Sequence, residues 1–266
     1  MPKPLPLPIR VLVKGASTVI AMSEVGAPRE EFTFPRAIEA TLLQAGHPVD
    51  VHTFGVASER TKTTLRTWES EIMAWSPDVV ILVYGHYESI HFILPWWLER
   101  HANSLRRRPG KVRETYRARL LRPIWMALAK LQAKLDLRLN SLMFASRPKR
   151  VAADLERLIT HASGVSSPLI ILLELLPPTG KGRSWFPGMT ERIDMMNQTI
   201  AAMVARLDNP NVRIFPVSDA VTRHVPEGEN PTPDGFHYTA TLHREVGKEL
   251  AAEILSWVEK QPHLQL

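Results

Sequence analysis

Two runs of consecutive apolar residues dominate the sequence: VVILV at residues 79–83 and LIILL at residues 169–173. Neither run alternates between apolar and polar residues, which is typical of strands that are covered on both faces of a parallel sheet. Further runs of strand length occur at residues 9–13, 49–54 and 212–217. Amphipathic segments of helix length lie between and after them, at about 33–45, 62–75, 150–162, 190–207 and 240–259. This alternation predicts an α/β fold: a three-layer, doubly wound parallel sheet of about five strands with right-handed crossovers.

The segment from about 89 to 149 interrupts this rhythm after the third predicted strand. Its apolar residues recur every three or four positions, which predicts a long helix with one apolar stripe. The stripe consists of Leu121, Ile124, Leu128, Leu131, Leu135, Leu139 and Leu142. We therefore expect a single domain spanning residues 1–266, with a helical insertion at about 89–149 that lies over the strand ends.

Positive charge is concentrated in this insertion. Residues 101–150 contain fourteen Lys and Arg against two acidic residues, a net charge of +12, whereas the whole chain of 266 residues carries +6. Three interpretations are open: the stripe packs on the body beneath a solvated basic face, the insertion is a lid, or it binds nucleic acid. As a lid it would form an apolar tunnel for an acyl chain with Trp96, Trp97 and Trp125, and its basic face would meet an acyl-CoA, a carrier protein or an anionic bilayer. Nucleic-acid binding is not expected, because the basic residues match no known binding module with interleaved stacking aromatics.

The composition excludes several classes of protein. The absence of cysteine excludes a disulfide scaffold, Cys-ligated zinc or iron–sulfur and a thiol nucleophile. No apolar stretch approaches the ~20 residues of a membrane-spanning helix. Prolines at positions 2, 4, 6 and 8 interrupt the apolar region that a secretory signal needs, so we expect a cytoplasmic protein. No spacing typical of a metal or nucleotide-phosphate site stands out, and we expect neither a metal nor another cofactor.

One hydroxyl and one imidazole follow the first and last predicted strands. Ligands of an open parallel sheet bind beyond the carboxyl ends of its strands, so Ser17 and His237 are expected at the same edge. A serine hydroxyl becomes an effective nucleophile when a neutral imidazole accepts its proton, and a carboxylate must hold that imidazole in the right tautomer. Asp234 precedes His237 by three residues, with Gly235 between them to permit a tight turn. The sequence therefore predicts a nucleophile, a base and an orienting acid.

The order of these residues resembles the SGNH/GDSL hydrolase superfamily. The resemblance covers Val11–Thr18, Gly55–Thr61, Pro77–Glu88 and Asp234–Leu250. It implies the three-layer fold of that family and a catalytic triad in which Ser17 is the nucleophile, His237 the base and Asp234 the acid. A looser similarity in arrangement links the chain to intracellular actinobacterial sugar acyltransferases of this fold.

The family's oxyanion-binding residues are only partly present. The second block of the family supplies a backbone N–H from a glycine; here Ser58 aligns with it, and Gly55 stands three residues earlier. The third block, Gly-x-Asn-Asp in the family, is GHYE at 85–88, so that Tyr87 replaces the asparagine and its hydroxyl is a candidate substitute donor. Beside Gly85, the residues His86 and Glu88 have two open interpretations, contact with the substrate or bracing of the loop.

These residues predict a serine esterase or acyltransferase that acts on an acyl ester, with a sugar or small metabolite as a candidate substrate. Water as the acceptor gives hydrolysis, and a hydroxyl compound as the acceptor gives transfer. The alternative is a catalytically inactive protein of this fold that binds a ligand or another protein, an interpretation that the altered third block favours. Glu174, at the end of a buried strand, needs a partner for its charge. An ion pair with the insertion or with Arg183 is expected, and a contact with the substrate is the alternative.

Overall fold

The computed structural model describes residues 7–23, 32–56, 59–90, 101, 110–139, 146–186, 188–261 and 264. Five parallel strands form its sheet in the order β2-β1-β3-β4-β5. Their bounds are β1 (Ile9–Gly15), β2 (Val49–Gly55), β3 (Val79–Val83), β4 (Leu169–Leu173) and β5 (Val212–Phe215). The five predicted strands are thus confirmed. In this order the chain reverses its direction of progress between β1 and β3, and ligands of such sheets bind at that switch point.

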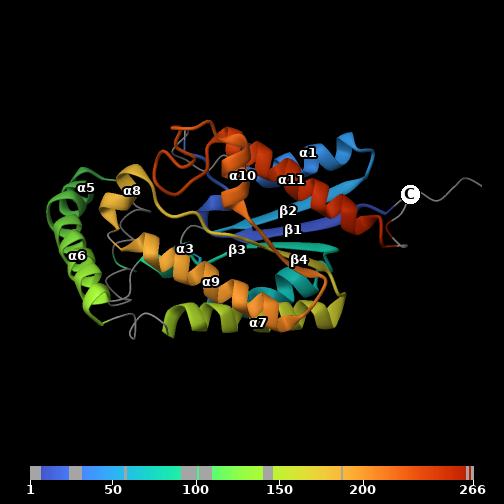
Figure 1. The fold of residues 1–266 in the computed structure, drawn as a ribbon, viewed down its shortest axis with the longest axis horizontal. Coiled ribbons are helices and arrows are strands. Elements are labelled where there is room, and N and C mark those ends of the chain that lie inside the picture. Colours follow the sequence, from blue (N-terminus) through green and yellow to red (C-terminus); the bar gives the residue numbers. More distant parts are fainter. Residues whose placement is uncertain are drawn as a thin grey trace, which may run out of the picture.

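Helices cover both faces of the sheet, which confirms the predicted three-layer architecture (Figure 1). One face is covered by α1 (Phe34–Gln44), α10 (Val217–His224) and α11 (Ala240–Val258). The other is covered by α2 (Thr61–Trp68), α7 (Ser146–Val165) and α9 (Met189–Leu207).

The two cores explain why the central strands are apolar throughout. In β3, Val79, Ile81 and Val83 pack into the core beneath α1 and α11. Val80 and Leu82 point the opposite way, into the core beneath α7 and α9. Successive side chains of a strand alternate between its faces, so a strand buried on both faces needs an apolar residue at every position.

Several short helices were not expected from the sequence. They are a 3₁₀ turn η1 (Ser17–Val19), α3 (His86–Ile90), α8 (Gly180–Trp185) and α10. The run at 212–217, expected to be a strand over its whole length, ends at Phe215 because Pro216 has no N–H for the strand ladder, and α10 begins at the next residue. The helix expected over 62–75 is divided: α2 ends at Trp68 and a π-helical turn η3 (Glu69–Met73) continues it.

The insertion after β3 is helical over its described residues 111–139. It contains α5 (Lys111–Tyr116), a π-helical turn η4 (Arg117–Leu121) and α6 (Arg122–Leu139), which lie at one end of the molecule, outside the layers (Figure 1). The expected packing of its stripe is only partly correct: Leu121 is buried, but Ile124 and Leu131 are exposed. Trp96, Trp97 and Leu142 lie outside the described residues. Among the helices that are described, none is both long and apolar enough to cross a membrane.

Gly247 sets the distance between α11 and α1. A Cβ atom at this position would lie 2.4 Å from the Cβ of Ala37 and 2.8 Å from the carbonyl oxygen of Phe34. Both distances are shorter than non-bonded atoms allow. The two neighbouring atoms belong to the rigid part of α1, so they cannot move aside as the end of a flexible side chain could. A glycine is therefore required for this helix contact.

We expect Gly247→Ala to lower the free energy of unfolding by about 1–3 kcal/mol, because the added methyl group overpacks the contact with α1. Gly164→Ala is the matched control, since a Cβ at Gly164 in α7 would meet nothing within 4 Å. That control should raise stability by about 0.4–1 kcal/mol, the usual gain when alanine replaces glycine in a helix. Urea unfolding measures both values, and equal stability of the two variants would contradict this account of Gly247.

Candidate active site

Ser17 is placed by the abrupt end of β1. A Cβ at Gly15 would lie 2.8 Å from the carbonyl oxygen of Val83, so β1 and β3 come as close here as a glycine permits. The chain then enters η1, in which the N–H of Ile20 donates to the carbonyl of Ser17 at 3.1 Å. The half-buried Ser17 thus occupies the first position of a turn at the carboxyl edge of the sheet.

Asp234 and His237 are placed by a tight turn just before α11. One Asp234 oxygen, Oδ1, accepts the backbone N–H groups of Phe236 at 2.9 Å and of His237 at 2.8 Å. Gly235 has a φ of +101°, and a Cβ there would lie 2.6 Å from the Cα of Gly182, so the predicted need for glycine in this turn is correct. The hydroxyl of Thr239 caps α11 by accepting the N–H of Leu242 at 3.2 Å.

The structure brings the three predicted residues into one hydrogen-bonded chain. His237 Nε2 lies 2.8 Å from Ser17 Oγ, and His237 Nδ1 lies 2.6 Å from Asp234 Oδ2. Because a carboxylate accepts the Nδ1 proton, Nε2 of the neutral ring has a lone pair for the serine hydroxyl. The side chains of His237 and Asp234 remain 23% and 33% exposed, so the chain of groups is accessible from solvent.

The surroundings of Asp234 keep it ionised. Burial acts to raise the pKa of this carboxyl, but the hydrogen bonds from the His237 ring and from the N–H groups of Phe236 and His237 outweigh burial, and the pKa lies below its ordinary value. A charged Asp234 holds the imidazole in the tautomer described above. It also stabilises the imidazolium that forms when His237 takes a proton.

The structure describes the glycine of the second predicted block but not the residue expected to donate to the oxyanion. Gly55 ends β2 opposite Gly15 of β1. A Cβ at Gly55 would lie 2.3 Å from Ile20 Cγ2, so this glycine makes room for the turn that carries Ser17. Ser58, the residue expected to supply a backbone N–H to the oxyanion, lies outside the described residues.

The third block also begins with a glycine that the local backbone conformation requires. Gly85 has a φ of +121°, and a Cβ there would lie 2.6 Å from Leu175 Cδ1. Its carbonyl accepts the N–H of Ser89 at 2.9 Å at the start of α3. Two residues on, the centre of the Tyr87 ring lies 5.2 Å from the guanidinium carbon of Arg60, a cation–π contact that links the third block to the end of the second.

His86 braces the loop after β4. Its Nε2 lies 3.0 Å from the carbonyl oxygen of Leu176, which can only accept, so Nε2 carries the proton of a neutral ring. Burial lowers the pKa of His86 to about 4. The side-chain amide of Asn197 holds the neighbouring Leu175: Asn197 Oδ1 accepts the backbone N–H of Leu175 at 3.0 Å, and Asn197 Nδ2 donates to its backbone carbonyl at 2.9 Å. His86 had two open interpretations, contact with the substrate or bracing of the loop. The hydrogen bond to Leu176 supports bracing of the loop.

Glu88 also has a bracing partner, at the end of the second block. Its Oε1 accepts the backbone N–H of Thr61 at 2.8 Å and the Thr61 hydroxyl at 3.3 Å. Thr61 is the first residue of α2, so Glu88 provides the hydrogen bond that the helix start needs. Burial raises the pKa of the Glu88 carboxyl.

The sequence interpretation, which ended the first strand at residue 13, missed a buried polar network behind the site. Lys14 instead lies in β1, fully buried, and forms ion pairs with Glu71 and, at 3.6 Å, with Glu59. Glu59 also accepts the hydroxyl of Tyr84 at 3.1 Å, and burial raises the pKa of the Glu59 carboxyl. The network ties the chain three residues before Ser17 to Glu59 of the second block and to Glu71. The signal available in the sequence was a lysine directly after the apolar run VLV in IRVLVKG.

Glu174 has a different partner from the one expected. Its Oε2 accepts the backbone N–H of Ser218 at 2.8 Å and the Ser218 hydroxyl at 2.6 Å. Ser218 lies in the first turn of α10, so Glu174 satisfies a free N–H at the start of that helix. The expected ion pair with the insertion or with Arg183 is therefore wrong: a backbone amide at a helix start, rather than a cation, receives the charge.

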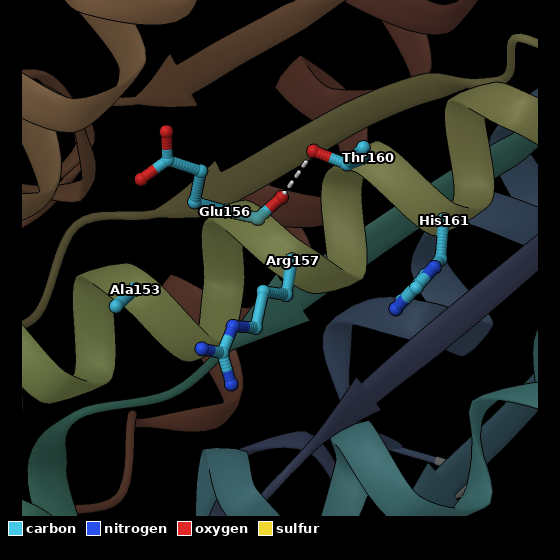
Figure 2. Close-up of a pocket in the computed structure, with 5 residues that line it drawn as sticks. All are labelled: Ala153, Glu156, Arg157, Thr160 and His161. Atoms are coloured by element: carbon cyan, nitrogen blue, oxygen red, sulfur yellow. Dashed lines mark hydrogen bonds between the residues drawn. The ribbon is translucent and has the colours of Figure 1, made fainter.

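The hollow drawn in Figure 2 lies apart from these residues. Its five lining residues all belong to α7, and none of them is a candidate residue of the site: Ala153, Glu156, Arg157, Thr160 and His161. Among the residues that the structure describes, no group of three or more His, Cys, Asp or Glu gathers in a way that could hold a metal ion.

His243 is a structural histidine. It is fully buried, its Nδ1 accepts the N–H of Phe34 at 3.2 Å, and its Nε2 donates to the carbonyl of Ala21 at 3.1 Å. Burial lowers the pKa of His243 to about 4. Protonation of Nδ1 would cost both the burial of a charge and the hydrogen bond to Phe34.

We expect His243 to make the protein less stable as the pH falls from 7 to 4. The unfolded chain binds a proton at this histidine near its ordinary pKa of 6.5, and the folded chain only near 4, so protons favour the unfolded state between these values. His243→Gln removes the titrating group, and its free energy of unfolding should fall less steeply over this interval than that of the parent protein. Urea unfolding at several pH values measures both slopes, and identical slopes would contradict the prediction.

Comparison with solved structures identifies the fold. No protein-family model and no curated protein sequence matches the chain. A lipase/acylhydrolase from Enterococcus faecalis has a TM-score of 0.59 at 14% identity, with 93% of this chain and 96% of that chain covered. A G-D-S-L family protein from Desulfitobacterium hafniense has a TM-score of 0.56 at 11% identity, with coverage of 92% and 98%. A carbohydrate acetylesterase from Sinorhizobium meliloti has a TM-score of 0.54 at 14% identity, with coverage of 93% and 99%.

These likenesses extend over nearly the whole of each chain, and they include the three-layer sheet described above. They confirm the fold that the resemblance to the SGNH/GDSL hydrolases implies. The chain has the fold of the SGNH/GDSL acylhydrolases.

Proposed function

We propose that this protein is a serine esterase that cleaves acyl esters through an acyl-enzyme intermediate. The observation that carries the proposal is the 2.8 Å contact between Ser17 Oγ and His237 Nε2, with Asp234 2.6 Å from the other ring nitrogen. The order and geometry of the three groups are those that activate a serine hydroxyl in unrelated hydrolase folds.

The mechanism follows from the proton positions. Ser17 Oγ attacks the carbonyl carbon of the ester while His237 Nε2 takes the hydroxyl proton, and Asp234 stabilises the imidazolium. The tetrahedral intermediate collapses as His237 returns the proton to the departing alcohol. Water then loses a proton to His237 and attacks the acyl-enzyme, and Ser17 leaves with that proton as a free hydroxyl.

The developing oxyanion needs donors at the same edge. We assign this role to the backbone N–H groups of Ser17 and Ser58 and to the hydroxyl of Tyr87. Two observations support Tyr87: it follows Gly85 at the carboxyl end of β3, next to β1 in the sheet, and Arg60 packs on its ring, which restricts how the ring moves.

The substrate class is an acyl ester of a sugar or other small metabolite. Relatives in fold include a lipase/acylhydrolase and a carbohydrate acetylesterase, which supports ester substrates of this kind. Transfer shares the acyl-enzyme with hydrolysis and differs only in its acceptor, a hydroxyl compound in place of water. An acyl-CoA or an acyl carrier would serve the same serine as a thioester donor.

Ser17→Ala should abolish labelling by a fluorophosphonate probe and should lower kcat/KM for p-nitrophenyl acetate by at least about 10³-fold, because the nucleophile is lost. Asp234→Asn should lower kcat by about 10²–10⁴-fold, because the imidazole loses the partner that fixes its tautomer. Ser70→Ala is the matched control, since Ser70 is an exposed serine in η3.

The control should retain both labelling and hydrolysis. Absence of labelling in the parent protein, under conditions in which other serine esterases react, would overturn the proposal. That result would favour the alternative, a catalytically inactive protein of this fold that binds a ligand.

Tyr87→Phe should lower kcat by about 10²-fold with little change in KM, because an oxyanion donor acts in the transition state rather than on the bound substrate. The substitution retains the ring that Arg60 contacts, so it removes the hydroxyl alone. Tyr116→Phe, on the exposed surface of α5, is the control and should change neither constant. Full activity of Tyr87→Phe would remove Tyr87 from the mechanism.

A further inference from the structure

The helical insertion carries an exposed apolar face that the proposed chemistry does not use. Five apolar side chains recur along α5, η4 and α6 at intervals of four residues, the last after seven. They are exposed to the following extent: Val112 84%, Tyr116 38%, Leu120 51%, Ile124 42% and Leu131 48%. Residues at these intervals lie on one side of a helical segment. We refer to these five side chains as the arm stripe.

The residues that adjoin the arm stripe on α6 are more covered. Leu121 is buried, and Trp125 and Leu128 are half-buried, so the exposed stripe borders a covered strip of apolar residues. A single exposed aliphatic residue needs no explanation, because much of any protein surface is apolar. Five along one helical face, beside a covered face on the same helix, are typical of an interaction surface.

Charge specifies the partner of this surface. Residues 111–139, which form these helices, contain eight Lys and Arg and two acidic residues, Glu114 and Asp136. Arg119, Lys130 and Lys134 are exposed and lie beside the arm stripe. A partner that covers the stripe must therefore offer negative charge next to an apolar region.

We propose that α5, η4 and α6 dock on the surface of an anionic lipid bilayer. The arm stripe enters the boundary between headgroups and acyl chains, and Arg119, Lys130 and Lys134 reach the lipid phosphates with their long side chains. Val112, Leu120, Ile124 and Leu131 are aliphatic, and Tyr116 is the one aromatic residue of the stripe. A bilayer surface accepts both kinds of side chain, whereas a surface that stacks nucleic-acid bases needs several aromatics.

Docking in this way gives the molecule a defined orientation. Figure 1 shows α5 and α6 at the same end as α8, which follows the carboxyl end of β4. The edge of the sheet that carries Ser17 and His237 therefore turns toward the bilayer. The docking itself does not depend on the proposed hydrolysis, and the two can fail separately.

Co-sedimentation with lipid vesicles tests the role of charge. The parent protein should bind vesicles of phosphatidylcholine and phosphatidylglycerol at least 10-fold more tightly than vesicles of phosphatidylcholine alone, and salt should weaken the binding. The triple variant Arg119→Gln/Lys130→Gln/Lys134→Gln should bind the anionic vesicles at least 10-fold more weakly. The control Lys62→Gln/Lys149→Gln/Lys260→Gln removes the same charge from exposed positions elsewhere and should bind like the parent protein.

A second pair of variants tests the apolar contact. Leu120→Ser/Ile124→Ser/Leu131→Ser should lose at least 10-fold in affinity for the anionic vesicles, whereas Leu43→Ser/Met73→Ser/Val165→Ser, at comparably exposed positions, should not. Circular dichroism establishes that the variants are folded. Hydrolysis of soluble p-nitrophenyl acetate should be equal in all of them, which separates docking from catalysis.

Three outcomes would overturn the proposal. The first is that the parent protein binds neither kind of vesicle. The second is that the control variants lose as much affinity as the arm variants. The third is tighter binding to a single-stranded oligonucleotide than to the anionic vesicles, unaffected by the serine substitutions in the arm stripe, which would assign the surface to nucleic acid.

Discussion

The candidate site depends on the carboxylate of Asp234. One of its oxygens accepts two backbone N–H groups and shapes the turn, while the other lies 2.6 Å from His237 Nδ1. The same group therefore sets both the path of the chain and the orientation of the imidazole. Because these hydrogen bonds lower the pKa of Asp234, the carboxylate stays charged, and a charged carboxylate is what the serine–imidazole pair requires.

Close contacts at three glycines fix the distances between the elements around this turn. Gly235 lies against Gly182 of α8, Gly15 against Val83 of β3, and Gly55 against the turn that holds Ser17. In each case a Cβ atom would fall within 3 Å of a neighbour, so the elements meet at distances that only glycine allows. These contacts bring a hydroxyl and an imidazole that are 220 residues apart in the sequence to hydrogen-bonding distance.

Buried polar groups stabilise the remaining loops of the edge from behind. Glu88 holds the start of α2, His86 holds the loop after β4, and Lys14 joins the end of β1 to Glu59. Lys14 and Glu88 are buried, His86 is half-buried, and each has a partner. The second oxygen of Glu88, Oε2, is buried without a hydrogen bond. The helices of the insertion differ in this respect, since their outer face leaves five apolar side chains in solvent.

The sequence by itself determined the five strands and the layered fold, because a strand buried on both faces needs apolar residues throughout, as in 79–83 and 169–173. It also predicted the turn of Asp234, Gly235 and His237, since all the groups that form this turn lie within four residues. The partners of Lys14, Glu174 and the histidines, and the residues of α6 that are covered, became visible only in the folded chain. The physical reason is the same for each: the contacting groups come from segments far apart in the chain, and their distances exist only once the sheet and its helices have packed.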